Sequence, residues 1–186
     1  MQGRSRSRIL KALLLFIATY LISLLLWIQV KDYYGMAVTY AVSHIMTLVK
    51  DVSYEGMTKD GSNVIQTRFI PLRHKSQLML EIPVKTSSYT FNMPLTIAII
   101  SSLGPFIVRK GRAYTEALVI LFMVHLLYVF SLQANELTGV FIRLGYEEIS
   151  KPRLFLYQFL WTFTDNMVIR FEPFLIGFYV YMRFRK

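Results

Sequence analysis

The hydrophobic pattern of this chain consists of long apolar blocks separated by short polar segments. Residues Ala12 to Val30 form an uncharged run of 19 residues, and about 20 apolar residues suffice to cross a bilayer as a helix. Three more blocks follow: Met93 to Val108, Ala113 to Leu132, and a last block that ends with Phe174 to Met182. The pattern predicts an α-helical membrane protein with four transmembrane helices, three of them within residues 93–186.

Two of these blocks have alternative interpretations. The second block has 16 residues, and its Gly104-Pro105 pair should end or kink a helix early, so a re-entrant segment competes with a full crossing. The first block follows basic residues, as the apolar region of a signal peptide does, but it is longer than the roughly 7–15 residues of such a region. We expect an uncleaved anchor.

Three basic clusters flank the apolar blocks and predict the orientation of the chain. They are Arg4, Arg6, Arg8 and Lys11; Arg109, Lys110 and Arg112; and Arg183, Arg185 and Lys186. Short segments rich in Lys and Arg stay in the cytoplasm. Four spans with both termini in the cytoplasm put ten basic residues and only Glu116 on that side, so residues 1–11 form a basic cytoplasmic N-terminus.

A five-span topology is the main competitor, because Tyr33 to Val49 is also free of charge. If this segment crossed the membrane, the Arg109 to Arg112 turn would lie outside, against the positive-inside rule. Its apolar residues instead recur at three- and four-residue spacing, as in a helix that lies against a neighbour. We therefore expect one helix over residues 12–49, of which the second part is an extracytoplasmic extension.

Between the first and second spans the pattern changes to that of a β structure. From Asp51 to Asn92 charged and β-branched residues return, and Lys59-Asp60-Gly61-Ser62 is a typical turn sequence. Apolar residues alternate at Leu78, Leu80, Ile82 and Val84, and Tyr89 with Phe91 is a possible last strand. The pattern predicts a small extracytoplasmic antiparallel β region over residues 50–92, whose inward row packs on the helix before it. A second outer loop is expected at residues 133–153.

Composition excludes several classes of function. The chain is 54% hydrophobic and 17% charged, its mean hydropathy is +0.43, and its net charge of +10 sits beside the apolar blocks, so we expect no nucleic-acid partner. It has no Cys, which excludes disulfides, thiolate metal sites and cysteine nucleophiles. Its three His, at positions 44, 74 and 125, lack the spacing of metal ligands. We expect no cofactor and no enzymatic activity.

Charged residues in the last helix are the candidate functional residues. Asp165, Arg170 and Glu172 occur where a span should be apolar, and a charge inside a bilayer costs at least about 2.5–3.5 kcal/mol. Glu172 is 11 residues before Arg183, or roughly 16 Å along a helix, which predicts a position near mid-bilayer. We expect Glu172 to point inward, either protonated or paired with His125 of the third helix.

A second candidate site is a basic stretch in the outer β region. Arg68, Arg73 and Lys75 are close in sequence there. Such a stretch predicts contact with anionic headgroups of the lipid bilayer or with an acidic segment of a partner.

The order of elements resembles that of a known family. The segment Tyr89-Thr90-Phe91-Asn92-Met93-Pro94-Leu95 leads into the short second block, and a basic turn, a helix, an outer loop with Gly145 and the final helix follow. In this layout the chain resembles the small membrane proteins associated with exosortase H. The resemblance implies a bacterial inner-membrane accessory of exosortase, a multispanning cysteine transpeptidase that processes proteins with a C-terminal sorting helix. It implies no site residues in this chain.

Three functions follow, in this order. The leading hypothesis is a non-enzymatic membrane accessory subunit that binds a larger integral membrane protein or complex. The alternative is a subunit of a redox or proton-translocating membrane complex, with Glu172, Arg170 and His125 in the proton path. An enzyme that acts on a lipid comes third.

Overall fold

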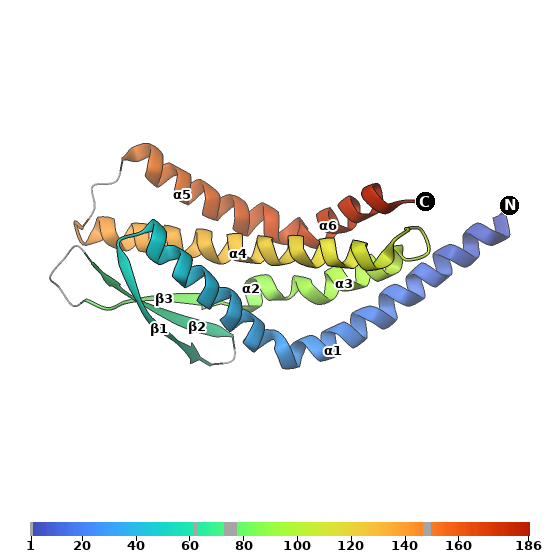
Figure 1. Ribbon diagram of the computed structural model, residues 1–186, viewed down its shortest axis with the longest axis horizontal. Coiled ribbons are helices and arrows are strands. Elements are labelled where there is room, and N and C mark those ends of the chain that lie inside the picture. Colours follow the sequence, from blue (N-terminus) through green and yellow to red (C-terminus); the bar gives the residue numbers. More distant parts are fainter. Residues whose placement is uncertain (1, 62, 73–77, 147–149) are drawn as a thin grey trace. The chain divides into compact units, whose positions relative to one another are not determined.

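The computed structural model describes residues 2–61, 63–72, 78–146 and 150–186, with the backbone alone for residues 2–6 (Figure 1). In this part of the chain the structure is mostly helical, with one small antiparallel sheet. The elements in chain order are α1 (Gln2–Val49), β1 (Val52–Asp60), β2 (Val64–Pro71), β3 (Leu80–Lys85), α2 (Ser87–Thr90), α3 (Asn92–Leu103), α4 (Lys110–Arg143), α5 (Lys151–Phe163), the π-helix η1 (Thr164–Val168) and α6 (Ile169–Phe184).

The chain divides into two compact units, which we describe separately. The helical unit consists of Met1–Lys31, Thr90–Val124 and Arg170–Lys186. The sheet unit consists of Asp32–Tyr89 and His125–Ile169. The long helices α1 and α4 each contribute a first part to the helical unit and a second part to the sheet unit.

The sheet has the strand order β1-β2-β3, and both pairs are antiparallel. Gly61 takes a left-handed conformation (φ +68°) in the turn between β1 and β2, where the sequence predicted a turn. Leu80, Ile82 and Val84 are buried and alternate with exposed residues, as expected, whereas Leu78, predicted in the same row, precedes β3 and is exposed. The predicted small antiparallel β region is confirmed.

The prediction of a possible last strand at Tyr89 and Phe91 is wrong. The chain enters α2 at Ser87 and α3 at Asn92. At the end of β3, the amide and the hydroxyl of Thr86 both donate to the Asn63 carbonyl oxygen, at 2.8 and 3.1 Å. These are the last bonds between the two strands, and the chain then turns into α2, in which Tyr89 is buried.

The structure contains two, not four, helices that are long and apolar enough to cross a membrane, as judged over the described residues by length and composition. These helices are Ser7–Val49 and Lys110–Arg143. The second predicted span is shorter than expected: α3 has 12 residues and is about 18 Å long, against a hydrocarbon core of about 30 Å. It ends where Gly104 and Pro105 follow. The last predicted span corresponds to α6, which has 16 residues and directly follows η1.

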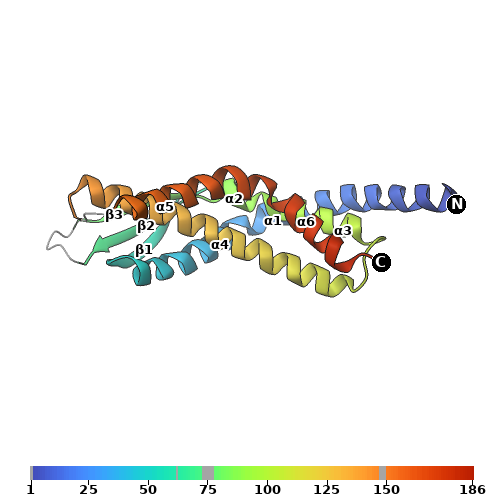
Figure 2. The same cartoon turned by 90° about the horizontal axis from the view of Figure 1, so that it is seen from above.

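The core of the helical unit lies between α3, α4 and α6 (Figure 2). Small residues let these helices approach closely, since a Cβ atom added at Gly177 would lie 2.5 Å from Ile99 Cγ2. The buried cluster contains Ile100, Ile107, Ala113, Ala117, Leu121, Ile176, Val180 and Phe184.

Candidate partner-binding site

The inner face of the sheet packs on the second part of α1, as the sequence predicted. The ring centroids of Tyr40 and Tyr54 are 6.1 Å apart, and those of His44 and Tyr54 are 5.1 Å apart. Burial and the neighbouring Tyr40 raise the pKa of Tyr54. A Cβ atom at Gly35 would lie 2.5 Å from Thr86 Cγ2, so only glycine allows this approach of helix to sheet.

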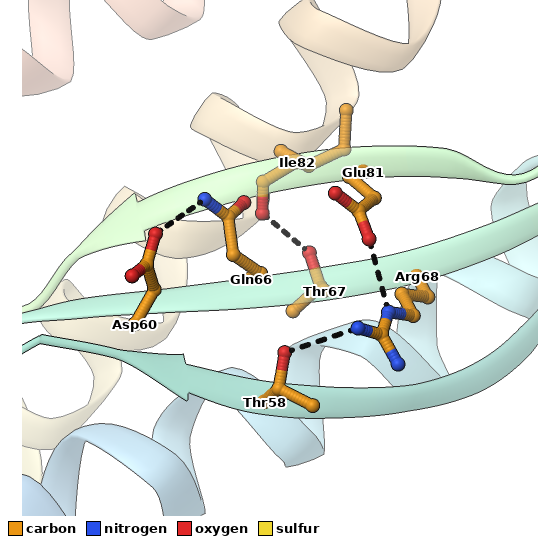
Figure 3. A network of polar contacts seen from close by, with 7 residues as sticks. All are labelled: Thr58, Asp60, Gln66, Thr67, Arg68, Glu81 and Ile82. Carbon is orange, nitrogen blue, oxygen red and sulfur yellow. Dashed lines mark hydrogen bonds and ion pairs between the residues drawn. The ribbon is translucent and has the colours of Figure 1, made fainter.

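A buried hydrogen-bond network joins the sheet to α1 and α4. Gln133 Nε2 donates to Ser43 Oγ at 3.0 Å and to Thr67 Oγ1 at 3.5 Å. Thr67 in turn donates to the carbonyl oxygen of Ile82 at 2.9 Å (Figure 3). Because all three side chains are buried, these bonds fix the position of α4 against the sheet.

The inner face of α5 packs on α4 and on the residue that follows α1. Tyr157, Trp161 and Asp165 follow at four-residue spacing, which places them on one face of a helix. The rings of Trp161 and Tyr128 are 5.2 Å apart, and the Tyr128 hydroxyl donates to Asp165 Oδ1 at 3.3 Å. Lys50 Nζ lies 4.6 Å from the centre of the Tyr157 ring.

The opposite face of α5 carries three phenylalanines, which we call the phenylalanine ladder: Phe155, Phe159 and Phe163. Their side chains are 68%, 53% and 46% exposed. Consecutive rings stack, with centroids 6.1 and 5.7 Å apart and interplanar angles of 20° and 13°. The contacts of the inner face orient α5, so the ladder forms a continuous aromatic surface of the sheet unit.

A cleft of about 370 Å³ lies beside the inner face of α5. Its wall on α4 consists of Tyr128, Leu132 and Glu136, which follow at four-residue spacing. Its wall on β3 consists of Pro83 and Lys85, which belong to the exposed row of that strand. Charged groups of both signs line it together with aromatic rings, a combination that suits a peptide segment with hydrogen-bonding groups. The lining residues are Pro83, Lys85, Ser88, Tyr128, Leu132, Glu136, Trp161 and Asp165.

The π-helix η1 contributes Asp165 to the lining of the cleft. The amide of Ile169 donates to the carbonyl oxygen of Thr164, a step of five residues. Single π turns inside α-helices are frequent at functional sites. Here the wide turn contains Asp165, the only one of the predicted charged residues of the last helix that lines the cleft.

The other predicted charged residues have separate environments. In the helical unit, Glu172 is 1% exposed and its Oε2 accepts a hydrogen bond from Asn92 Nδ2 at 2.9 Å, whereas Arg170 is exposed. In the sheet unit, His125 Nδ1 lies 2.7 Å from the Tyr34 hydroxyl. Glu172 is thus inward as expected, and its pairing with His125 stays a prediction because the two residues belong to different units.

Of the three residues of the predicted basic contact site, the structure describes only Arg68. This side chain donates from Nε to Glu81 Oε1 at 3.0 Å and from Nη2 to Thr58 Oγ1 at 3.5 Å (Figure 3). Arg73 and Lys75 lie outside the described residues. Arg68 therefore has partners within the sheet, and its role in binding a lipid or partner stays a prediction.

No group of three or more His, Asp and Glu that could hold a metal ion occurs among the described residues.

Tyr89 is a packing residue of the sheet unit. Burial raises the pKa of Tyr89 above its ordinary value, and its hydroxyl donates to the Gly35 carbonyl oxygen at 3.5 Å. The Tyr89 ring also packs on the His125 ring, with centroids 5.2 Å apart. These contacts give both residues a part in packing the sheet unit.

Apolar helices, a small sheet and an exposed aromatic surface together define a class of helical proteins suited to contact with lipid and with other membrane proteins. The chain belongs to the family of exosortase H-associated membrane proteins, whose family model matches residues 6–184. The resemblance inferred from the sequence is thereby confirmed, and the membrane character of the family agrees with the two long apolar helices. Neither a curated protein nor a solved structure matches the chain.

Proposed function

We propose that this chain is a non-enzymatic accessory subunit of the bacterial inner membrane that binds exosortase H through the phenylalanine ladder of α5. The family description names exosortase H as the associated protein. The observation that carries the proposal is the stack of three exposed phenylalanines on the face of α5 that points away from α4.

The chemistry of the ladder favours a protein partner. Aromatic residues are enriched in the centres of protein interfaces, where they bury a large area at a low cost in side-chain entropy. The stacked rings are already ordered before binding, so a partner would lose little free energy in fixing them. A partner surface with apolar side chains would complement this row.

Orientation is part of the same proposal. Both termini and the Arg109 to Arg112 turn lie in the cytoplasm, and the sheet unit lies on the other side of the membrane. The three basic clusters support this orientation. With α3 shorter than a full span, residues 104–108 complete the second crossing in a non-helical conformation within the helical unit.

Co-purification with exosortase H from membranes in mild detergent tests the proposal. The triple variant Phe155→Ala, Phe159→Ala and Phe163→Ala should recover at least about tenfold less exosortase H than the wild type, since truncated aromatic anchors each cost about 1–2 kcal/mol. Equal recovery would contradict the proposed binding surface.

A matched control uses the exposed phenylalanines of α6. The variant Phe174→Ala and Phe178→Ala also removes exposed aromatic rings at four-residue spacing, but from the helical unit. It should recover exosortase H as the wild type does. Thermal unfolding in detergent should be similar for both variants, which separates lost binding from lost folding.

Glu172 favours a second candidate, a subunit of a redox or proton-translocating complex. A buried carboxyl group in an apolar helix is a typical element of proton paths. Glu172→Gln, which removes the titratable group but keeps a polar side chain, distinguishes this function from assembly.

A further inference from the structure

Three arginines meet in one hollow at the end of the helical unit where α4 begins and α6 ends. The hollow has a volume of about 370 Å³ and is lined by Val108, Arg109, Arg112, Arg183 and Phe184. We call Arg109, Arg112 and Arg183 the arginine pocket. They come from the turn before α4, from its first turn and from the last turn of α6.

Backbone pairing holds the two sides of the hollow together. Val108 N donates to the carbonyl oxygen of Phe184 at 2.8 Å, and Lys186 N donates to that of Phe106 at 3.1 Å. Arg109 has a left-handed backbone conformation (φ +48°), in which the chain turns into α4. The geometry of the pocket therefore rests on fixed backbone on both sides.

Glu116 orients two of the arginines without neutralising the pocket. Arg112 Nε donates to Glu116 Oε1 at 2.9 Å, and Arg183 Nε donates to Oε2 at 2.8 Å. The Tyr179 hydroxyl also donates to Oε2, at 2.9 Å. Both carboxylate oxygens are thus engaged, both arginines use Nε for this contact, and Arg109 has no acidic partner within the described part of the chain.

The charge of the whole unit adds to that of the pocket. The sequence of the helical unit contains twelve Lys and Arg against two Glu, whereas that of the sheet unit contains nine basic and nine acidic residues. The entire formal charge of +10 therefore belongs to the helical unit. Guanidinium groups bind phosphate oxygens with bidentate geometry, and the N-terminus of a helix such as α4 adds positive partial charge.

We infer that the arginine pocket binds the phosphate of an anionic phospholipid. In the proposed orientation, the pocket lies at the cytoplasmic ends of α4 and α6, at the level of the headgroup phosphates, and basic pockets between helices there bind anionic headgroups. Val108 and Phe184 supply apolar walls for the part of the lipid next to its phosphate. The occupant is therefore a lipid, and the test distinguishes it from free phosphate, which has the same charged group.

Lipid retention by the full-length protein tests this inference. The protein is equilibrated with vesicles of phosphatidylcholine and phosphatidylglycerol in equal parts, transferred to mild detergent and analysed by native mass spectrometry. The wild type should retain phosphatidylglycerol in preference to phosphatidylcholine. The variant Arg109→Gln and Arg183→Gln should retain about tenfold less of it, the effect of losing charge-assisted bonds to one phosphate.

The control variant Arg8→Gln and Lys11→Gln removes the same charge from the exposed N-terminal part of α1. It should retain phosphatidylglycerol as the wild type does, and an equal loss in both variants would overturn the inference in favour of a general surface attraction. Displacement of phosphatidylglycerol by inorganic phosphate would assign the pocket to free phosphate and overturn the lipid assignment. If the double variant does not fold, Arg109→Gln alone keeps the contacts of Glu116 with Arg112, Arg183 and Tyr179 and should still lower retention.

Discussion

Glu172 illustrates how far single residues can be interpreted from the sequence. A carboxyl group within an apolar helix stands out in the sequence because its burial is costly, and the structure has it buried. Its hydrogen-bond donor, Asn92, is the first residue of a different helix, α3, and has no feature in the sequence that indicates this contact. The need for a partner could be predicted, but its identity depends on how α3 and α6 pack.

Substitutions at Glu172 separate assembly from proton transfer. Glu172→Gln keeps an acceptor for Asn92, so the free energy of unfolding should change by less than about 1 kcal/mol, whereas Glu172→Leu removes this acceptor and should cost about 1–3 kcal/mol. Thermal unfolding in detergent measures both. We expect exosortase H to co-purify normally with the Gln variant and more weakly with the Leu variant. Loss of function in the Gln variant at unchanged recovery would support the proton path instead.

At the scale of elements, α5 was the least predictable. The segment from Leu154 to Phe163 is apolar and aromatic, and the four-residue spacing of Phe155, Phe159 and Phe163 is visible in the sequence. Which face of α5 is covered depends on the contact of Trp161 with Tyr128, across 33 residues of chain. The alternation of buried and exposed residues along β3 was easier to predict, because it can be seen in neighbouring residues of the sequence. The short α2 was missed because a sequence pattern does not show where a ladder ends.

The contact between α1 and the sheet depends on Gly35. Gly35→Ala should destabilise the protein by about 1–3 kcal/mol, because overpacking forces a shift in a close-packed region. The new methyl group would displace Thr86, whose hydroxyl is bonded to the Asn63 carbonyl oxygen. Thermal unfolding in detergent measures this loss.

Gly139 on α4 is the matched control, because it also lies in a helix of the sheet unit. A Cβ atom added there meets nothing within 4 Å. Gly139→Ala should therefore raise stability by about 0.5–1 kcal/mol through helix propensity. Equal effects of the two alanines would show that the approach of α1 to the sheet is not tight.

At the scale of the whole molecule, charge and hydropathy were the most informative properties of the sequence. They indicated a helical membrane protein and the order of its elements, and this order led to the correct family. Within the described residues, two helices rather than the predicted four are long and apolar enough to cross a membrane, because the length of an apolar block sets only an upper limit on the helix within it. The arginine pocket was also missed as a pocket, since Arg183 follows Arg109 and Arg112 by more than 70 positions.

Reporter fusions test the proposed orientation. A reporter that is active only in the periplasm should be inactive when fused after Arg112 or after Lys186, because basic segments stay in the cytoplasm. It should be active when fused after Asp60 in the sheet unit. Activity after Arg112 would contradict the orientation and favour a re-entrant second segment.

Site-specific photo-crosslinking in intact cells shows whether exosortase H binds at the phenylalanine ladder. A photoreactive phenylalanine analogue replaces Phe159 in one strain and Phe178 in another, so that both probes occupy exposed aromatic positions. We expect a covalent adduct with exosortase H from position 159 and none from position 178. An adduct from position 178 with none from position 159 would contradict this expectation.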